Sequence, residues 1–432
     1  MVLIADATLP DGRTRDVRVA DGRIDAVGES LDGAPVVDAA GRHLLPGMID
    51  VHVHFRQPGA AHKETWATGS RSAAAGGVTT VVDQPNTDPP TVSGAAYDEK
   101  AALAADSLVD YGLNGGVTAD WDPDSLFERP LFALGEVFLA DSTGDMGIEA
   151  DLFRAAADRA GEEDVPVTVH AEDAALFDEG ARDRDDADAW SAYRTATAEA
   201  EAVERALDVG EATDAQIHVA HTSTPEGIDA AAAAGATCEV TPHHLFLSRE
   251  DLSELGTFGR MNPPLRSAER REAVFDRVVD GTVDVIATDH APHTRAEKDA
   301  DIWDAPSGVP GVETALPLLL AAVADGSLTL KRVRDLTAAN PATIFDLPSK
   351  GRIEEGRDAD LVLVDLDSTR PIRGDDLHSK CGWTPFEGWD GVFPTWTMRR
   401  GDVVYADADT ALPDEIAPEG TFGAPNGENV RD

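Results

Sequence analysis

The chain has 432 residues and a formal net charge of −45, because 81 aspartates and glutamates outnumber 36 lysines and arginines. Nucleic-acid backbones and anionic membrane surfaces are bound by lysine and arginine, so this charge argues against both kinds of partner. No apolar run reaches the ~18–20 residues of a membrane span, and the first residues lack the basic start of a secretory signal. Two cysteines, Cys238 and Cys381, are too few for a disulfide framework, which favours a reducing cytoplasm.

The charged residues are also unusual in kind and distribution. Only six of the 36 basic residues are lysines, and the acidic residues are spread along the whole chain. Such a surface repels itself at low salt, and about 1 M salt screens most of that repulsion. We interpret the composition as adaptation to a salt-saturated cytoplasm like that of halophilic archaea. An acidic patch for a basic partner, the alternative interpretation, would concentrate the charge in one region.

Short strands and turns are expected at both ends of the chain. Residues 2–28 contain short apolar runs, and Asp-Gly pairs at 11–12 and 21–22 mark hairpin turns. A similar β-rich texture returns at 351–367 and 396–409. Two such segments so far apart in sequence predict one small β-domain assembled from both termini.

The middle of the chain alternates apolar strand candidates with alanine-rich helical stretches such as 225–235 and 267–280. The strand candidates are residues 48–54, 77–86, 111–117, 131–139, 165–173, 216–223, 237–244 and 283–290. Eight alternating units over about 300 residues favour a closed barrel over an open sheet.

The predicted fold class is therefore α/β, a (β/α)8 TIM barrel with a small β-sandwich domain built from both termini. The predicted parts are residues 1–46 and 351–410 for the β-domain, 47–350 for the barrel, and 411–432 for a tail with little to bury.

Side chains able to bind metals or move protons lie at the carboxyl ends of the predicted strands. They include His52, His54, Asn86, Glu136, His170, His221, Asp289 and His293. These strand ends meet on one face of a (β/α)8 barrel. His52 and His54 are two residues apart on a strand, so they point the same way and can hold one ion together. Imidazole and carboxylate ligands with little thiolate suit zinc or a similar divalent ion.

Several longer motifs follow one another in a distinctive order. They are DVHVHFRQPG (50–59), GGVTTVVDQPNTDP (76–89), VTVHAED (167–173), HVAHTSTPEG (218–227), VTPHHLFL (240–247), MNPPLR (261–266), VIATDHAPH (285–293) and SGVPGVET (307–314). As a set they resemble the motifs of the dihydroorotases, cyclic amidohydrolases of pyrimidine synthesis, from about residue 40 to 365.

The resemblance implies a metal centre and a catalytic acid-base residue. It places one zinc on His52, His54 and Asp289, and a second on His170 and His221. Asp289 would accept a proton from the attacking water and deliver it to the leaving ring nitrogen. The reaction implied is the reversible interconversion of dihydroorotate and N-carbamoyl-L-aspartate.

The resemblance also implies a set of substrate-binding residues. Arg56, Asn86 and His293 would bind the substrate carboxylate, and Asn262, Gly308 and Pro310 would contact the ring. A guanidinium matches a carboxylate with two parallel hydrogen bonds. A surface salt bridge for Arg56, and turn geometry beside a proline for the two asparagines, are the structural alternatives.

One departure from the family pattern concerns the fourth strand. Many relatives carry a carbamylated lysine there as a bridge between two metals, but this chain has Glu136 and no lysine from 101 to 297. We expect Glu136 to bridge directly, with Asp141 as a less favoured substitute. A glutamate is shorter than a carbamylated lysine, so the number of metal ions bound per subunit, one or two, is left open by the sequence. The remaining alternative is that Glu136 forms a salt bridge inside the barrel and binds no metal.

Two other functions remain as alternatives. Allantoinases and hydantoinases share the barrel, but they generally lack an arginine two residues after the His-x-His motif. A non-catalytic homologue could serve as a scaffold for a transcarbamoylase, yet such relatives usually lose metal ligands. The sequence leaves open the oligomeric state, a transcarbamoylase partner, and the choice among zinc, manganese and cobalt.

Overall fold

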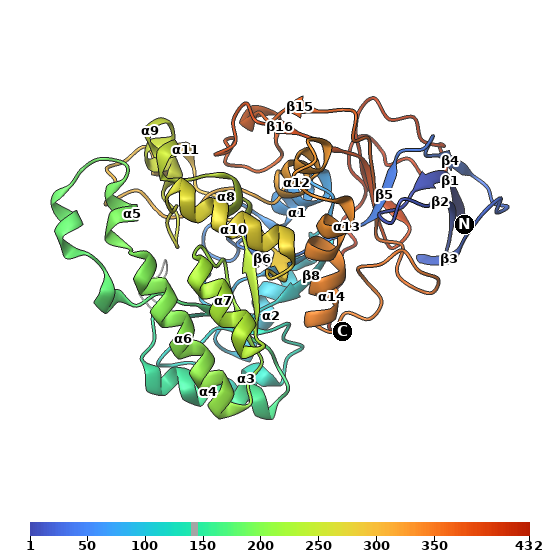
Figure 1. Ribbon diagram of the computed structural model, residues 1–432. Helices are drawn as coiled ribbons and strands as arrows, with labels where there is room; N and C mark the ends of the chain where they lie inside the picture. The colour runs from blue at the N-terminus through green and yellow to red at the C-terminus, as the bar shows by residue number, and fades with distance from the viewer. Residues whose placement is uncertain (140–145) are drawn as a thin grey trace.

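The chain forms a closed barrel of parallel strands with a mostly antiparallel sheet beside it (Figure 1). The computed structural model describes residues 1–139 and 146–432. The sheet joins strands from the first 46 residues to strands beyond residue 360. The predicted fold class, a (β/α)8 barrel with a β-domain built from both termini, is confirmed.

Eight parallel strands of the described chain form the barrel. They are β6 (Met48–Val53), β7 (Val78–Asp83), β8 (Asp110–Leu113), β9 (Leu134–Phe138), β10 (Val167–His170), β11 (Ile217–Val219), β12 (Thr237–Val240) and β13 (Val285–Ile286). Strands β6 to β8 pair as one arc and β9 to β13 as another. Parallel bridges from Gly115 to Leu134 and from Val53 to His290 join the two arcs. The strands are buried almost throughout because helices cover their outer face.

The longer helices alternate with these strands. They are α1 (Trp66–Ala75), α2 (Gly94–Ala104), α4 (Ala150–Glu162), α6 (Ala196–Thr213), α7 (Pro225–Ala234), α10 (Ala268–Asp280) and α12 (Ala315–Ala324). Shorter ones are α3 (Pro123–Phe127), α5 (Ala189–Tyr193), α8 (Pro242–Phe246), α9 (Leu252–Leu255), α11 (Arg295–Lys298), α13 (Leu330–Arg334) and α14 (Asn340–Ile344). Within the part of the chain that the structure describes, no helix has the length and apolar character that crossing a membrane requires.

Local sequence signals explain where helices begin and end, and α7 is the clearest case. The Thr224 side chain accepts a hydrogen bond from the Gly227 amide, and Pro225 occupies the first helical position. Gly235 ends the helix with a left-handed φ of 70°. The helix predicted over 225–235 is therefore present almost residue for residue.

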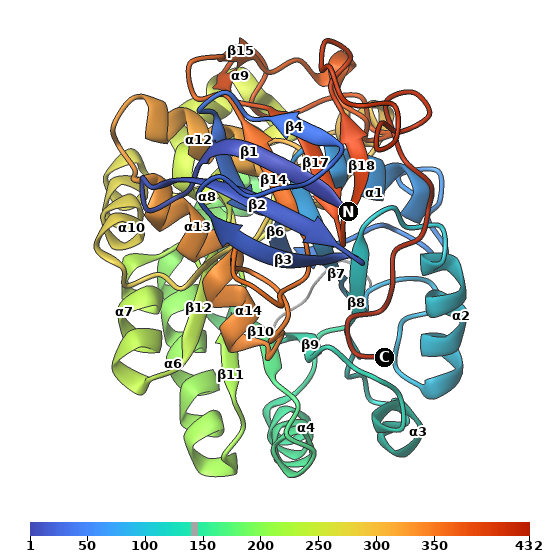
Figure 2. The ribbon, with the colours of Figure 1, turned by 90° about the vertical axis from the view of Figure 1, so that its right-hand side faces the viewer.

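The second sheet has the strand order β18-β17-β14-β5-β1-β2-β3, with β4 beside β1 (Figure 2). Its strands are β1 (Val2–Thr8), β2 (Thr14–Ala20), β3 (Arg23–Gly28), β4 (Val36–Asp38), β5 (His43–Pro46), β14 (Leu361–Val364), β17 (Pro394–Arg399) and β18 (Asp402–Ala406). A separate small pair joins β15 (Arg370–Pro371) to β16 (Asp390–Gly391). The predicted hairpin at 21–22 is present, since Ala20 pairs with Arg23 and both turn residues have positive φ.

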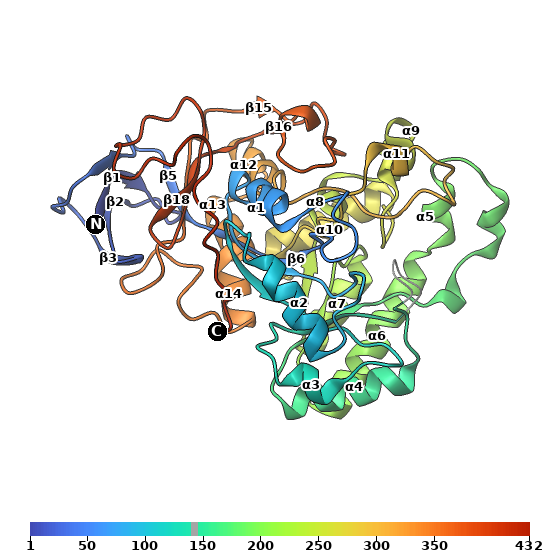
Figure 3. The ribbon, with the colours of Figure 1, turned by 180° about the vertical axis from the view of Figure 1, so that it is seen from behind.

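The last residues of the chain dock on the barrel (Figures 2 and 3). Asn429 forms a parallel bridge with Tyr111 of β8, and its side chain donates a hydrogen bond to the Tyr97 hydroxyl. The Glu428 amide donates to the Asp110 carboxylate at 3.1 Å. The tail is thus an arm that adds backbone pairing to β8.

Candidate active site

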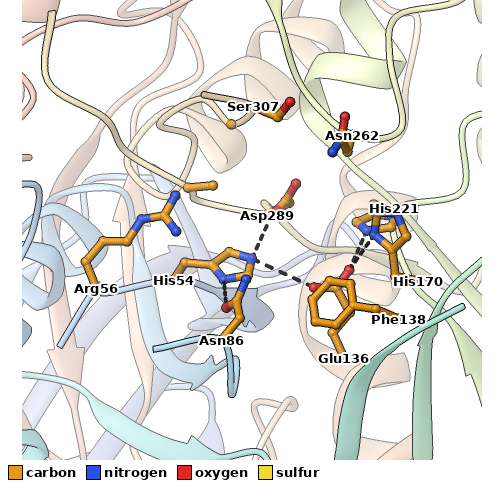
Figure 4. Close-up of a pocket in the computed structure, with 12 residues that line it drawn as sticks. His54, Arg56, Asn86, Glu136, Phe138, His170, His221, Asn262, Asp289 and Ser307 are labelled. Carbon is orange, nitrogen blue, oxygen red and sulfur yellow. Dashed lines mark hydrogen bonds and ion pairs between the residues drawn. The ribbon is translucent and has the colours of Figure 1, made fainter. Parts of the chain in front are cut away.

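The six predicted metal ligands meet at one end of the barrel, and Figure 4 shows five of them, all but His52. His52 lies within β6 and His54 just after it, Glu136 lies within β9, His170 ends β10, His221 follows β11 by two residues, and Asp289 follows β13 by three. All six side chains are buried. The barrel topology therefore gathers residues that lie as much as 237 positions apart in the sequence.

The backbone turns sharply at three of the predicted site residues. Arg56, His221 and Asp289 have φ angles of 64°, 31° and 46°. Non-glycine residues avoid this left-handed region, and those found there cluster at functional sites. At these positions the chain leaves a strand and directs a side chain toward the barrel mouth.

Glu136 lies between two pairs of histidines. Its Oε1 is 2.6 Å from His221 Nε2 and 3.0 Å from His170 Nδ1. Its Oε2 is 3.3 Å from His52 Nε2 and 4.0 Å from His54 Nε2. Each carboxylate oxygen thus faces a different pair, which is the arrangement a bridging ligand requires.

Asp289 lies beside the pair formed by His52 and His54. Its Oδ1 is 3.0 Å from His54 Nε2 and 3.5 Å from His52 Nε2. Burial opposes ionisation of this carboxyl, but the hydrogen bond to His54 and the charge of His52 outweigh burial and lower its pKa to about 2. Asp289 is therefore a carboxylate near neutral pH, able to accept a proton.

The donor set fits divalent cations. His52, His54 and Glu136 form one group with ligand atoms within 4.8 Å of one another, and Glu136, His170 and His221 form a second. Among the described residues, the buried His52 Nε2 makes no well-aligned hydrogen bond, although Glu136 Oε2 lies 3.3 Å away. Burial lowers the pKa of His52, yet the carboxylates of Glu239 and Glu136 outweigh it and hold that pKa well above its usual range. The carboxylates that favour a proton on His52 also favour a metal cation in place of that proton.

A second layer of carboxylates and one amide orients these histidines. His52 Nδ1 lies 2.6 Å from Glu239 Oε1, and His54 Nδ1 lies 2.7 Å from Asn86 Oδ1. His170 Nε2 is 3.0 Å from Glu172 Oε2. Such partners fix the ring orientation of metal-binding histidines.

Sequence reasoning missed Glu239 and Glu172, although both left a signal. Glu239 is a carboxylate inside the apolar strand β12, and Glu172 follows His170 by two residues on the same side of the chain. Arg194 pairs with the buried Glu172 and completes its charge balance.

The cluster of histidines and carboxylates borders a cavity of about 40 Å³. Its lining residues are His54, Arg56, Asn86, Glu136, Phe138, His170, His221, Asn262, Asp289, Ala291, Ser307 and Gly308. Four of the six predicted substrate-binding residues are thus brought together here. His293 lies next to Arg56 outside this lining, and Pro310 is buried two residues beyond Gly308. Phe138, Ala291 and Ser307 were not expected, since nothing in their residue type indicates a site.

Arg56 is a buried cation without a carboxylate partner among the described residues. Its Nε donates to the Pro292 carbonyl at 3.2 Å, and its Nη2 lies 3.2 Å from His293 Nε2. Burial lowers the pKa of Arg56 to about 10, so the guanidinium stays charged near neutral pH. A buried charge that lacks an opposite charge favours binding of an anion.

Two further contacts shape the walls of the cavity. Trp190 Nε1 donates to Asn262 Oδ1 at 2.9 Å, so the free donor of Asn262 is its NH2 group. Gly308 has a φ of 129°, and a Cβ there would lie 2.6 Å from the Ala291 carbonyl oxygen. Only glycine fits this turn. Asp141, the alternative bridging carboxylate, falls outside the described residues.

Comparisons with known proteins agree with this geometry. A family model described as "Amidohydrolase family" matches residues 43–404. The chain is 72% identical over 412 residues to the dihydroorotase of Halobacterium salinarum, covering 95% of this chain and 97% of that protein. It is 34% identical to an allantoinase of Escherichia coli O1:K1 / APEC, covering 95% of each. Among solved structures, the L-hydantoinase (dihydropyrimidinase) of Arthrobacter aurescens matches with a TM-score of 0.91 at 27% identity over 99% of each chain.

Proposed function

Because this chain belongs to the amidohydrolase family, and within it to the dihydroorotases, we propose that its buried histidines and carboxylates catalyse the reversible ring closure of N-carbamoyl-L-aspartate to dihydroorotate and water. The observation that carries this choice of substrate is the buried guanidinium of Arg56 beside the cluster, which has no carboxylate partner among the residues that the structure describes. Dihydroorotate bears a free carboxylate, the group that such a guanidinium binds through two hydrogen bonds.

We assign the metal ligands from the contacts of Glu136 and Asp289. His52, His54 and Asp289 would hold one ion, and His170 and His221 the other, with Glu136 between them. Zinc suits a site of imidazoles and carboxylates. When bound, such ions polarise a carbonyl oxygen and lower the pKa of water.

In the ring-opening direction Asp289 acts as the proton carrier. Its carboxylate accepts a proton from the water whose oxygen forms a bond to the ring carbonyl carbon. As the carbon–nitrogen bond breaks, Asp289 delivers that proton to the departing nitrogen. Ring closure follows the same path in reverse. The hydrogen bond to His54 and the charge of His52 keep the carboxylate ionised in spite of its burial, and the hydrogen bond orients it for both transfers.

The substrate would be oriented by residues on both sides of the cavity: Figure 4 shows Arg56 and Asn86 away from His170 and His221, and Asn262 nearer to them. Arg56 would bind the carboxylate, with His293 beside it. Asn86 is fixed through its Oδ1 by His54, which leaves its NH2 group as a donor. Trp190 likewise holds the Oδ1 of Asn262, so the Asn262 NH2 group would donate a hydrogen bond to the substrate ring.

The alternatives have less support. A carboxylate-free ring such as allantoin leaves the buried Arg56 without a counter-charge. A non-catalytic scaffold does not require six buried ligand side chains around two sites, all of which this chain keeps. The acidic, cysteine-poor composition supports a cytoplasmic location at high salt.

The test is an assay of dihydroorotate and allantoin side by side in about 1 M salt, where the protein's charges are screened. We expect turnover of dihydroorotate and none of allantoin. Asp289→Asn should lower kcat in both directions by about 10³-fold, because a general acid-base residue contributes on that scale. The exposed Asp276→Asn is the matched control. Turnover of allantoin alone, or an active Asp289→Asn, would contradict the proposal.

A further inference from the structure

Lys63 contacts His293 on the side away from Arg56. Lys63 Nζ lies 3.0 Å from His293 Nδ1 and 3.2 Å from Glu297 Oε1. The Lys63 side chain is only 17% exposed. Glu297 is itself held by the Thr294 amide and hydroxyl at the start of α11. This ammonium group is therefore kept against the histidine ring.

The contact determines which ring nitrogen of His293 carries the proton. A lysine ammonium can only donate, so His293 Nδ1 must accept and the proton lies on Nε2. His293 Nε2 is 2.9 Å from the Ser307 carbonyl oxygen and 3.2 Å from Arg56 Nη2. Burial, together with the charges of Arg56, Lys63 and Lys298, lowers the pKa of His293, so the ring is neutral. Its single N–H thus points toward the Arg56 side.

The use of lysine here stands out against the composition. The chain has only six lysines, and two of them, Lys63 and Lys298, lie beside this pocket. The Lys298 ammonium donates to the carbonyls of Arg260, Pro306 and Gly308, so its role is to hold the loops together. Lys63 differs because its partner is a titratable ring that adjoins the buried guanidinium.

We propose that Lys63 is a positioning residue for the substrate carboxylate, acting through His293. By fixing the Nε2–H form of the ring, Lys63 provides a second donor beside Arg56 that can turn from the Ser307 carbonyl to the carboxylate. The inference rests on the proposed function, since it concerns the same substrate group. It adds a specificity determinant that contacts neither the metal ligands nor the reacting carbonyl.

The test compares Lys63→Met with Lys380→Met, which removes an exposed lysine that contacts the Ala61 carbonyl on the same loop. Lys63→Met should raise KM for dihydroorotate roughly tenfold, the loss expected for one hydrogen bond to a charged group, with little change in kcat. Metal content and the thermal unfolding midpoint should stay at wild-type values. Lys380→Met should leave KM unchanged.

A double variant of Lys63 and His293 tests whether Lys63 acts by positioning the His293 ring or only through its charge. If Lys63 acts through the ring, the double variant Lys63→Met, His293→Ala should have the same KM as His293→Ala alone. Alkylation of Lys63→Cys with bromoethylamine restores an ammonium of nearly the same length and should restore KM, because Cys238 and Cys381 are buried.

Different outcomes would contradict the role of Lys63 and the proposed dihydroorotase activity. A wild-type protein that does not turn over dihydroorotate contradicts the proposed function. An active wild-type protein whose KM is unmoved by Lys63→Met contradicts the role of Lys63 alone. Additive effects in the double variant, or loss of metal in Lys63→Met, would do the same.

Discussion

At Arg56, a full positive charge is enclosed by the protein, and no carboxylate in residues 1–139 or 146–432 pairs with it. The side chain is 7% exposed, and the backbone there adopts a left-handed φ of 64°. Its protein contacts are the Pro292 carbonyl and the ring of His293, which orient the guanidinium without neutralising it. The binding energy of this group is therefore available to an anionic substrate.

Replacing Arg56 by alanine should weaken substrate binding and leave the metals in place. We expect KM for dihydroorotate to rise about 100-fold, since a bidentate, charge-assisted contact is lost. Steady-state kinetics and elemental analysis of the same preparation measure the two effects. Loss of bound metal in Arg56→Ala would show that Arg56 supports the cluster instead.

The site residues differ in how far they could be predicted from the sequence. His52 and His54 were accessible because alternation along a strand fixes their common direction. Glu239 stood out only as a carboxylate inside an apolar strand, because its role depends on β12 lying where its carboxylate meets His52 and His218. Pairwise contacts between distant strands carry no local sequence pattern.

Among the elements, the C-terminal arm and strand β8 share one buried charge cluster. Asp110 accepts hydrogen bonds from Lys350 at 2.8 Å, from Arg399 at 3.1 Å and from the Glu428 amide at 3.1 Å. Burial raises the pKa of Asp110, but Lys350 and Arg399 outweigh it and hold that pKa below its ordinary value. This cluster ties the β-domain and the arm to the amino-terminal end of β8.

Replacing Asp110 by asparagine should destabilise the protein in a pH-dependent way. We expect a loss of about 3 kcal/mol near pH 7, because a buried cation loses its partner. The pKa of Asp110 is lower in the folded protein, so its stabilisation is complete above about pH 4 to 5 and disappears as the pH falls through the folded value. The difference between wild type and variant should therefore shrink in acid.

Urea unfolding at fixed molar salt between pH 7 and pH 3 measures this difference. Asp402→Asn is the matched control, since that carboxylate is 68% exposed and lies 3.9 Å from Arg399. It should change the free energy of unfolding little. A difference for Asp110→Asn that stays constant down to pH 3 would contradict the assignment.

The sequence predicted the helices, strands and turns more completely than it predicted the contacts of the site residues. Turn residues and caps located the hairpin at 21–22 and the helix at 225–235 almost residue for residue. The docking of residues 426–431 could not be predicted, because it depends on partners in β8 and α2 about 320 positions earlier. Their composition alone indicated only a polar tail.

The whole molecule carries a net charge of −45. Many ion pairs of the described residues are arginine–carboxylate contacts at the surface, such as Arg129 with Asp98 and Arg277 with Asp229. Exposed pairs contribute little stability each, so they do not offset the repulsion among the excess carboxylates. The stability of this fold should therefore depend on screening by salt.

Dialysis from molar salt into dilute buffer should unfold the protein, as circular dichroism and loss of activity would show. Restoring about 1 M salt, with a screening length near 3 Å, should recover the fold if aggregation is avoided. Sucrose is the control, since it favours burial without screening charge and should protect less. A fold that persists in dilute buffer would contradict the adaptation to high salt.

The central claim is that Glu136 joins two metal sites, one at His52 and His54 and the other at His170 and His221. The most direct measurement is the number of zinc ions per chain after saturation and gel filtration in molar salt, in wild type and in Glu136→Ala. We expect two ions per chain in wild type and fewer in Glu136→Ala, with the count unchanged in the control Glu162→Ala, which replaces an exposed side chain. A metal-free wild type, or an unchanged count in Glu136→Ala, would contradict it.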